Sequence, residues 1–333
     1  MLEGKTILIT GGTGSFGKRC CLELIKSGTP TKIIILSRDE LKQYDMANSP
    51  EFQGLKNIRY FIGDVRDKER LARAMTDVDY VIHAAALKQV PAAEYNPHEF
   101  IKTNINGAMN VVDAAIASGV KKVVALSTDK AVNPINLYGA TKLCSDKVFI
   151  SANNYSGKKG TRFSVVRYGN VIGSRGSVIP LFLKQRETGT LTITKAEMTR
   201  FVITLGAGVH FALRSLVDML GGEIFIPKIP SCSLGDLAKA VAPDAKIKII
   251  GLRPGEKLHE AMVPEDEATQ TTEQEDRFII HPAQPYWHYE GKILHSGKQC
   301  PEGFSYSSET NPDQLNIEQI QDLVSRYQKQ TID

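Results

Sequence analysis

The chain has 333 residues, and at about 150 residues per domain this length suggests roughly two domains. Apolar residues make up 42% and charged residues 23%, which is typical of globular proteins and excludes a disordered chain, a collagen and a small disulfide-stabilised domain. The 41 basic and 37 acidic residues leave a net charge of only +4, without long basic runs, so a nucleic-acid partner is not expected.

The first half of the chain alternates short apolar runs with amphipathic stretches. The runs are rich in Val and Ile and lie at residues 6–10, 32–36, 57–62, 79–83, 121–126 and 163–167. Between them, residues 100–118 place apolar side chains on one helical face, and Gly119 is a stop signal for that helix. Apolar strands separated by helices indicate parallel pairing covered on both faces. The predicted fold class is therefore α/β, with a doubly wound parallel sheet of the Rossmann type.

After Gly169 the pattern changes to short elements separated by glycine and proline. Strands are expected at 190–193, 223–226 and 245–250, and helices at 178–187, 208–219, 234–241 and about 317–327. We interpret residues 1–168 as a first domain built on the sheet. Residues 169–333 are expected to form mainly a smaller α+β lobe, with segments near 200–226 returning to the first domain.

A glycine-rich turn follows the first predicted strand. Its glycines satisfy both G-x-G-x-x-G and G-x-x-G-x-x-G, and they permit backbone N–H groups to approach a pyrophosphate at the start of the next helix. A plain tight turn is the alternative, but the position between strand and helix favours a dinucleotide. The candidate cofactor contacts here are Gly11, Thr13, Gly14, Ser15 and Phe16.

The tips of the next strands extend this candidate site. Ser37 and Arg38 stand where an NAD enzyme usually has an acid, and an arginine can pair with a ribose 2′-phosphate. We therefore expect NADP rather than NAD; in the alternative, Arg38 faces solvent and Asp39 takes the ribose. Bordering the same site, by their place after the third and fourth strands, are Asp64, Val65, Ala84 and Ala86.

Tyr138 and Lys142 lie one helical turn apart after the fifth strand, so they share one helix face. A nearby ammonium stabilises a phenolate, which would let Tyr138 exchange protons near neutral pH. Tyr155 and Lys159 have the same spacing in a polar loop, which we interpret as chance. The segment Ser127-Thr128-Asp129-Lys130, which precedes Tyr138, favours this tyrosine as the functional one. It ends a strand at the edge where parallel sheets place their sites.

Several classes of site and location are not expected. Histidines are few and lack metal-ligand spacing, so no metal site is predicted. The five cysteines form no C-x-x-C pair, which suits a reducing cytoplasm. No stretch approaches the roughly 18 apolar residues of a membrane span, and the early start of the first strand leaves no room for a signal peptide.

These motifs together resemble the extended short-chain dehydrogenase/reductase superfamily, over about residues 4–282. Within it, Thr128-Asp129-Lys130 resembles the inverting UDP-N-acetylglucosamine 4,6-dehydratases of pseudaminic acid biosynthesis, since retaining dehydratases usually carry Thr-Asp-Glu. Residues 191–200 and the tail after Pro282 match less clearly. The supporting strings are Ser37-Arg38-Asp39-Glu40-Leu41-Lys42, Ala84-Ala85-Ala86-Leu87-Lys88, Asn133-Pro134-Ile135-Asn136-Leu137-Tyr138, Arg167-Tyr168-Gly169-Asn170, Gly173-Ser174-Arg175-Gly176-Ser177 and Arg253-Pro254-Gly255-Glu256-Lys257.

The resemblance implies a redox-neutral reaction in which NADP+ takes a hydride from carbon 4 of the sugar and later returns it to carbon 6. Tyr138 is then the candidate base for the 4-hydroxyl, with Lys142 nearby, and Thr128 bonds the 4-oxygen. Asp129 is the candidate acid for the leaving 6-hydroxyl, and Lys130 the candidate base at carbon 5. Such a lysine must be neutral, so we expect its pKa to be depressed; the alternative is a surface lysine.

The resemblance also implies contacts with both ligands. A guanidinium pairs with phosphate and a carboxylate accepts hydroxyls, so Arg253 and Glu256 suit the diphosphate and the ribose. Arg175 and Arg200 are weaker candidates, and any of these arginines could instead be a solvated charge. Further implied substrate contacts are Lys88, Asn170 and Val178. Further implied cofactor contacts are Lys42, Thr103, Asn104, Tyr138, Lys142 and Val171.

Other functions remain open on the same scaffold. A retaining dehydratase and a UDP-sugar 4-epimerase are the enzymatic alternatives, and neither an epimerase nor a scaffold protein would need Lys130. A non-catalytic NADP-binding protein would be expected to lack Tyr138, Lys142 or the Thr-Asp pair. The expected partners are a UDP-sugar and further copies of the chain, in a dimer-based oligomer or hexamer with helix 100–118 at the interface. No nucleic acid or membrane is expected.

Overall fold

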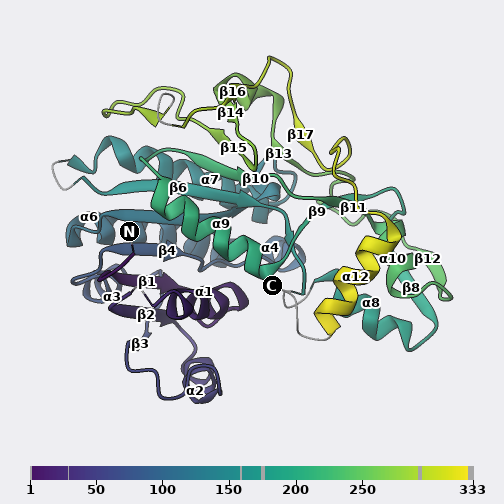
Figure 1. Ribbon diagram of the computed structural model, residues 1–333, viewed down its shortest axis with the longest axis horizontal. Coiled ribbons are helices and arrows are strands. Elements are labelled where there is room, and N and C mark those ends of the chain that lie inside the picture. Colours follow the sequence, from purple (N-terminus) through teal and green to yellow (C-terminus); the bar gives the residue numbers. More distant parts are fainter. Residues whose placement is uncertain (1, 29, 158–159, 174–176, 292–294, 329–333) are drawn as a thin grey trace.

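A ten-stranded sheet is the centre of the molecule (Figure 1). The computed structural model describes residues 2–28, 30–157, 160–173, 177–291 and 295–328. The strand order is β16-β14-β15-β10-β6-β5-β4-β1-β2-β3, and the pairs from β10 to β3 are parallel. These strands are β1 (Thr6–Thr10), β2 (Lys32–Ser37), β3 (Ile58–Ile62), β4 (Tyr80–His83), β5 (Lys122–Thr128), β6 (Arg162–Tyr168) and β10 (Ile224–Pro227). The predicted doubly wound sheet is confirmed.

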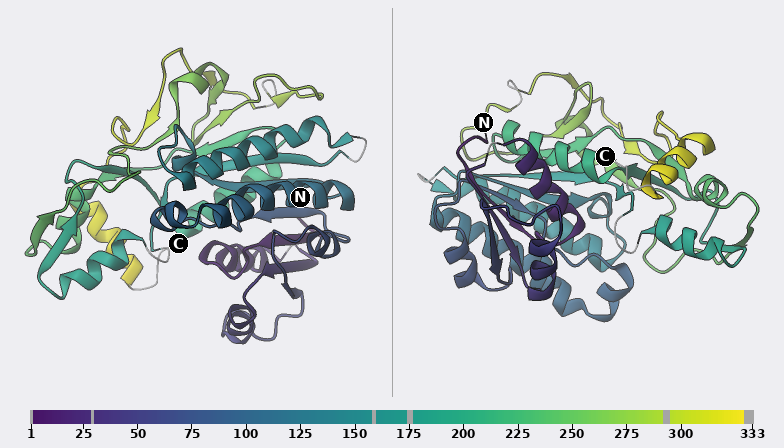
Figure 2. Two further views of the ribbon diagram at one scale, coloured as in Figure 1. Left: turned by 180° about the vertical axis from the view of Figure 1, so that it is seen from behind. Right: turned by 60° about the horizontal axis from the view of Figure 1, so that its bottom comes forward.

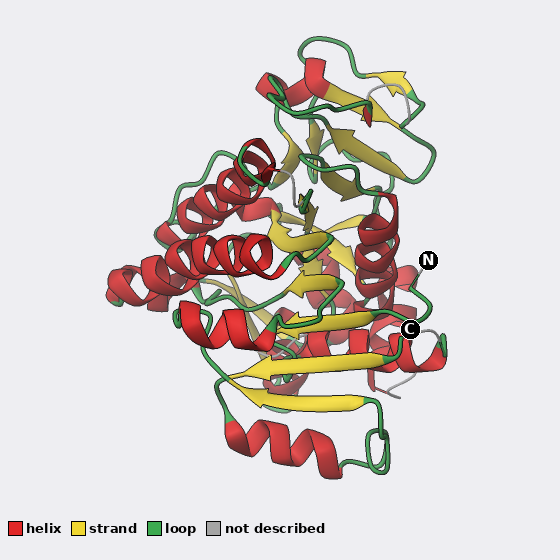
Figure 3. Ribbon diagram, turned by 90° about the vertical axis from the view of Figure 1, so that its left-hand side faces the viewer, coloured by secondary structure: helices red, strands yellow, loops and turns green. Residues whose placement is uncertain are grey.

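Helices cover both faces of this sheet, as the edge-on view shows (Figure 3). On one face, α1 (Ser15–Lys26) packs beside α9 (Leu205–Asp218). The opposite face, seen from behind in Figure 2, carries α3 (Lys68–Ala74), α6 (Gly107–Ser118) and α7 (Leu137–Ser151). The sandwiched strands are therefore almost entirely apolar, and Ile7, Leu8 and Ile9 of β1 are fully buried.

The helix expected at 100–118 is built from three successive pieces. It begins with α5 (Pro97–Phe100), after α4 (Val90–Tyr95), and widens into a π-helical segment (Ile101–Asn106) before α6. The predicted end is correct, because Gly119 adopts a left-handed conformation with φ of 70°. Within the π-helical segment, the Asn104 amide binds the backbone N–H and C=O of Leu87 at 2.9 Å each. The wider turn thus ties this helix to the loop after β4.

A smaller lobe lies at one end of the sheet (Figure 1). It contains α8 (Val178–Arg186), α10 (Leu234–Val241) and α12 (Ile317–Gln328), packed against the parallel pair β8 (Thr190–Ile193) and β12 (Lys246–Ile249). These helices share a separate apolar core that includes Phe182, Leu191, Leu237 and Ile320. A short sheet of β11 (Ser231–Ser233), β9 (Thr199–Ile203) and β7 (Asn170–Val171) leads from this lobe to the large sheet.

Later parts of the chain return to the large sheet. Within the segment 200–226, α9 covers the sheet and β10 pairs with β6. The antiparallel strands β14 (Thr271–Glu273), β15 (Arg277–Ile280) and β16 (Lys298–Gln299) then extend the sheet beyond β10. A separate pair joins β13 (Ala261–Val263) to β17 (Tyr306–Ser307). The sequence had indicated neither the antiparallel extension nor this pair.

The remaining helix, α2 (Glu40–Asn48), follows β2. Across the described ranges, no helix is both long enough and apolar enough to span a bilayer. All five cysteines are free thiols, and only Cys144 is exposed. Within the same ranges, no three His, Cys, Asp or Glu side chains gather closely enough to hold a metal ion.

Candidate active site

The glycine-rich turn between β1 and α1 is shaped by close backbone contacts. Gly11 has a φ of +66°, and a Cβ there would lie 2.9 Å from the backbone of Ala85. A Cβ on Gly17 would lie 2.4 Å from the Cα of Gly12. The first turn of α1 therefore reaches the strand end without side chains in between. Such a close approach of backbone at the start of a helix fits the pyrophosphate of a dinucleotide.

A cleft of about 1020 Å³ opens at the carboxyl ends of the parallel strands. It extends from the glycine-rich turn, past the tips of β2 and β4, to the end of β5 and the start of α7. Its lining includes most of the predicted cofactor residues: Gly11, Thr13, Gly14, Ser15, Phe16, Ser37, Arg38, Lys42, Asp64, Val65, Ala84, Ala86, Thr103 and Val171. It also includes the predicted catalytic and substrate residues Lys88, Thr128, Lys130, Tyr138, Lys142 and Asn170.

The predicted catalytic residue Asp129 is fully buried and is absent from this lining. Asn104 is also absent, contrary to its expected place. It is 2% exposed, and its amide nitrogen also donates to the Thr141 hydroxyl at 3.0 Å. With its bonds to Leu87, the whole amide is engaged within the protein. Asn104 therefore holds the loop that carries Lys88 instead of facing the cleft.

Some charged side chains at the tip of β2 are paired within the protein, and others remain exposed for a ligand. The Asp39 carboxylate caps α2 by accepting from the Lys42 N–H at 3.0 Å, and it lies 2.6 Å from the Lys42 ammonium. The Arg38 side chain is 50% exposed and approaches Asp64 only to 3.6 Å. Burial alone would raise the pKa of the Asp64 carboxyl, but hydrogen bonds from Arg66 outweigh it and lower the pKa. Arg38 is thus the cation that remains available at this tip.

Tyr138 and Lys142 are buried at the start of α7, at 9% and 3% exposed. Asn136 caps this helix by accepting from the Gly139 N–H at 2.8 Å. A Cβ on Gly139 would lie 2.2 Å from the Lys130 carbonyl oxygen, so α7 packs directly on the turn that follows β5. The cap and this contact place Tyr138 beside the residues that end β5.

The expectation that Lys142 brings the Tyr138 pKa toward neutrality is wrong for this structure. Burial raises the pKa of Tyr138 to about 12, against the opposing effects of the Lys130 ammonium and a hydrogen bond with Thr128. Burial also lowers the pKa of Lys142, although Asp146 opposes the shift. The cation that acts on Tyr138 is therefore Lys130.

Lys130 lies at the centre of a group of polar atoms. Its Nζ is 3.0 Å from Asp129 Oδ1, 3.4 Å from Asn170 Oδ1 and 3.4 Å from Glu260 Oε1. Thr128 donates to the same Asp129 oxygen at 2.9 Å. Burial lowers the pKa of Lys130, but the carboxylates of Asp129 and Glu260 outweigh it and raise the pKa. The expected depression is therefore wrong, because the Asp129 carboxylate and, to a lesser extent, the Glu260 carboxylate stabilise the ammonium.

Glu260 is not among the predicted site residues; it lies three positions after Lys257, just outside the string Arg253-Pro254-Gly255-Glu256-Lys257. Its carboxylate is only 2% exposed, at the start of a strand that continues Ala261, Met262 and Val263. A buried acid next to an apolar strand needs a partner. An acid directly before the apolar run 261–263 was the sequence signal for a buried, paired carboxylate. The sequence does not identify Lys130 as its partner.

The Arg253 turn lies apart from this group. Arg253 is 58% exposed and reaches Glu256 only at 3.9 Å. Arg200 donates to three backbone carbonyls, those of Thr199, Leu258 and Lys257, and so ties β9 to the segment that follows this turn. Arg253 and Glu256 are absent from the described lining of the cleft. Arg175 lies outside the described residues.

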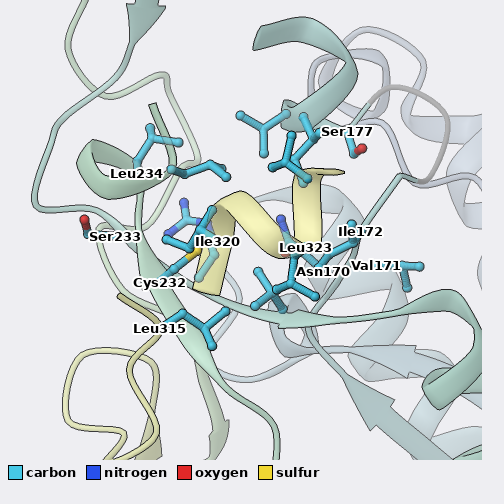
Figure 4. Close-up of a pocket in the computed structure, with 16 residues that line it drawn as sticks. Asn170, Val171, Ile172, Ser177, Cys232, Ser233, Leu234, Leu315, Ile320 and Leu323 are labelled. Carbon is cyan, nitrogen blue, oxygen red and sulfur yellow. The ribbon is translucent and has the colours of Figure 1, made fainter. Parts of the chain in front are cut away.

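A second, smaller pocket adjoins the cleft in the smaller lobe (Figure 4). Asn170, Val171 and Ser177 line both hollows, so the two are continuous. Val178 faces this pocket and not the large cleft. Its other walls are mainly apolar and come from three helices and β11, including Cys232, Leu234, Leu237, Ile320 and Leu323.

Comparisons with known proteins identify the family of the chain. The family model described as "Polysaccharide biosynthesis protein" matches residues 7–282. UDP-N-acetylglucosamine 4,6-dehydratase (inverting) from Campylobacter jejuni subsp. jejuni serotype O:23/36 (strain 81-176) is 55% identical, over 98% of each chain. UDP-glucose 4-epimerase from Rickettsia conorii is 41% identical, over 97% of this chain and 96% of its own.

Among solved structures, Pen from Bacillus thuringiensis matches with a TM-score of 0.89 and 40% identity, over 98% of this chain and 99% of that chain. The resemblance based on Thr128-Asp129-Lys130 is confirmed by the Campylobacter relative. The family match spans most of the chain, and the identities extend over nearly all of it. The chain therefore belongs to the polysaccharide biosynthesis protein family and has the fold of a short-chain dehydrogenase/reductase.

Proposed function

We propose that the chain is an inverting UDP-N-acetylglucosamine 4,6-dehydratase, a hydro-lyase that forms UDP-2-acetamido-2,6-dideoxy-β-L-arabino-hex-4-ulose. The observation that carries the proposal is the cluster at the end of β5. There the Lys130 amine lies 3.0 Å from Asp129, beside Tyr138 and on the wall of the cleft. An elimination across carbons 5 and 6 needs an acid and a base side by side, and this cluster supplies both once a proton passes from the Lys130 ammonium to the Asp129 carboxylate.

NADP is the cofactor that we assign to the cleft. The turn from Gly11 to Gly17 would hold its pyrophosphate, Arg38 its 2′-phosphate and Lys142 its nicotinamide ribose. When bound, the cofactor supplies hydride acceptance at carbon 4 and hydride return at carbon 6. The protein's own part is to bind, orient and move protons.

Each proton has a residue within the cluster. Tyr138, which bonds Thr128 in this cluster, takes the proton of the 4-hydroxyl as a phenolate, after its own phenol has lost a proton. Asp129, which is fully buried, donates a proton to the departing 6-hydroxyl. Lys130 removes the proton at carbon 5. If the proton that returns to carbon 5 arrives on the opposite face, the centre inverts and the L-configured sugar results.

The direct test is to incubate the chain with NADP and UDP-N-acetylglucosamine in deuterated water and to follow the product by proton NMR. We expect a 4-keto-6-deoxy product of L-arabino configuration that carries deuterium at carbon 5. A product of D configuration, or one that retains hydrogen at carbon 5, overturns the inverting assignment.

A UDP-sugar 4-epimerase is the second candidate, favoured by the 41% identity to the Rickettsia relative. Epimerisation at carbon 4 needs no base at carbon 5. Lys130→Ala therefore separates the two functions: it abolishes 4-keto-6-deoxy product in a dehydratase but leaves most of the activity of an epimerase. Recovery of UDP-N-acetylgalactosamine without any 4-keto sugar would favour the epimerase.

The choice of NADP has its own test at Arg38. Loss of a charge-assisted contact of about 2 kcal/mol weakens binding by roughly thirtyfold. We expect Arg38→Ala to lose that much affinity for NADP, measured by calorimetry, with little change for NAD. Arg66→Ala is the matched control, because Arg66 also pairs with Asp64 but is absent from the described cleft lining. Equal losses for both cofactors would contradict the assignment.

We further propose that the reaction is the first step of pseudaminic acid biosynthesis for surface glycosylation, carried out in the cytoplasm by a homo-oligomer. The five free thiols suit a reducing compartment. The helical face around α4 to α6 exposes Tyr95, Ile101 and Met109 at 87%, 38% and 50%, as a subunit interface would. Light scattering coupled to size exclusion measures the mass, and a monomer would contradict the oligomer.

A further inference from the structure

Glu260 is a buried acid next to the proposed catalytic cluster. It lies just before β13 and is 2% exposed. Its Oε1 is 3.4 Å from the Lys130 Nζ, and its Oε2 is 3.5 Å from the Lys257 Nζ. Oε2 has no hydrogen-bond partner within the described residues. Burying a carboxylate in such a place costs desolvation free energy, which is offset only if the charge is paired with a cation.

The backbone of Glu260 is fixed from a distant part of the chain. Its N–H donates to the Ser308 hydroxyl at 3.0 Å, and its carbonyl accepts from the Ser308 N–H at 2.8 Å. The Ser308 hydroxyl also bonds Thr199 at 2.8 Å, and Ser308 is fully buried. The carboxylate therefore approaches Lys130 from a rigid support that is independent of β5.

Charges surround Lys130 from several elements. Asp129 lies on its own turn after β5, and Glu260 approaches from the segment before β13. Opposing cations are Arg200 on β9 and Lys257, while Tyr138 adds a neutral phenol from α7. Lys257 is itself tied to the Val132 carbonyl on the near side of the cluster. Two carboxylates and no other described acid thus contact the Lys130 ammonium.

We propose that Glu260 is a positioning residue for Lys130, whose carboxylate orients the amine along the cleft and sets the pH at which the amine becomes a free base. This inference rests on the proposed function, because it assigns Lys130 as the base at carbon 5. Asp129 cannot serve this purpose throughout the reaction, since it is assigned as the acid and must carry a proton. Glu260 is assigned no proton transfer in the proposed reaction, so its contact with Lys130 does not depend on the stage of turnover.

The test is the pH dependence of product formation from UDP-N-acetylglucosamine with NADP present. The rising limb of kcat/KM reports the deprotonation of the free enzyme's base. Removing one nearby carboxylate lowers the pKa of a lysine by about one unit. We therefore expect the limb of Glu260→Gln to lie about one pH unit below that of the wild type, and the limb of Glu260→Asp to lie between the two.

A matched control is Glu273→Gln on β14, where the carboxylate pairs with Lys228 at 2.8 Å, far from the cleft lining. The rising limb of the kcat/KM profile of this variant should coincide with that of the wild type. If circular dichroism shows that Glu260→Gln does not fold, Glu260→Asp alone tests the proposal. We then expect the rising limb of its kcat/KM profile to shift to lower pH by a smaller amount. The pH dependence of Lys130 acetylation, followed by mass spectrometry, gives a second reading without turnover, and its midpoint should shift likewise.

The outcomes separate the two proposals. If the wild type forms the deuterated 4-keto product but the limbs of the Glu260 variants coincide with its own, this inference is overturned and the proposed function stands. The same holds if Glu260→Gln lowers activity equally at every pH, which is a purely structural effect. If the wild type forms no 4-keto product, the proposed function is overturned, and this inference with it.

Discussion

The large sheet and the smaller lobe position their site residues by different means. Around the sheet, backbone meets backbone: Gly17 lies against Gly12, and Gly139 lies against the Lys130 carbonyl. In the smaller lobe, α8, α10 and α12 pack through side chains around a separate core. The groups that carry the proposed chemistry are therefore fixed by contacts that tolerate no added atom. The proposed recognition of the sugar nucleotide depends on packing that can shift.

The largest expected effect follows from adding one methyl group at Gly17. A Cβ there would lie 2.4 Å from the Gly12 Cα and 2.5 Å from its carbonyl oxygen, and neither can rotate away. We expect Gly17→Ala to cost about 3 kcal/mol of unfolding free energy and to abolish NADP binding, because α1 must move away from the turn. Urea denaturation and a fluorescence titration measure the two effects.

Gly208→Ala on α9 is the control for this change. The nearest atom to a Cβ there is the Ile203 Cδ1 at 3.8 Å, which is an ordinary contact. Alanine is favoured over glycine in a helix by about 1 kcal/mol, so this variant should be as stable as the wild type or more so. If both variants had the same stability, backbone contact would not be what fixes the sheet side of the site.

A smaller effect is expected from the core of the second region. Ile320 on α12 is 2% exposed and lines the pocket beside the cleft. Ile320→Ala should cost about 2 kcal/mol, at the low end for such a deletion because neighbouring helices can close around the gap. We expect KM for the UDP-sugar to rise while NADP affinity stays unchanged.

Gln321→Ala, an exposed position on the same helix, should change neither quantity. A parallel loss of NADP affinity in Ile320→Ala would show that the two regions are coupled. In that case the contrast between a backbone-fixed half and a side-chain-packed half would no longer hold.

The same contrast explains what could be predicted from the sequence. The turn from Gly11 to Gly17 and the strand end at Thr128 follow from short-range requirements, namely close backbone approach and the end of an apolar run. Sequence patterns state such requirements directly. Helix ends were similarly accessible, as at Gly119, whereas the π-helical widening depends on the contact between Asn104 and Leu87.

The directions of the pKa shifts were harder to predict, because they depend on charged groups that are distant in the sequence and adjacent in the fold. The pKa of Lys130 is raised where a depression was expected, since the adjacent Asp129 and, from the segment before β13, Glu260 both stabilise its ammonium. The cation acting on Tyr138 is Lys130, although helical spacing suggested Lys142. Spacing along one helix identifies which side chains share a face, but it does not identify what faces them across the site.

The smallest expected effect concerns His83, at the end of β4 on the sheet side. Its ring is 2% exposed, its Nδ1 lies 2.8 Å from the Thr10 hydroxyl, and it packs on Phe149. Burial, with a contribution from the Lys142 ammonium, lowers the pKa of His83 to about 3. In the unfolded chain a histidine titrates near pH 6.5. The native state thus keeps the ring neutral across a range in which the unfolded state takes up a proton.

The sign of the pH effect follows from this difference. The stabilisation is complete above about pH 6.5 and is lost as the pH falls toward 3, because only the unfolded state then binds the proton. Between pH 7.5 and 5.5, His83 should account for a loss of about 1.4 kcal/mol. Urea denaturation at both pH values should show that loss in the wild type and in Thr10→Ser, which keeps the hydroxyl, but not in His83→Asn. An equal loss in His83→Asn would mean that the ring is hydrated in the native state, and the sheet side of the cleft would then be less rigid than its backbone contacts indicate.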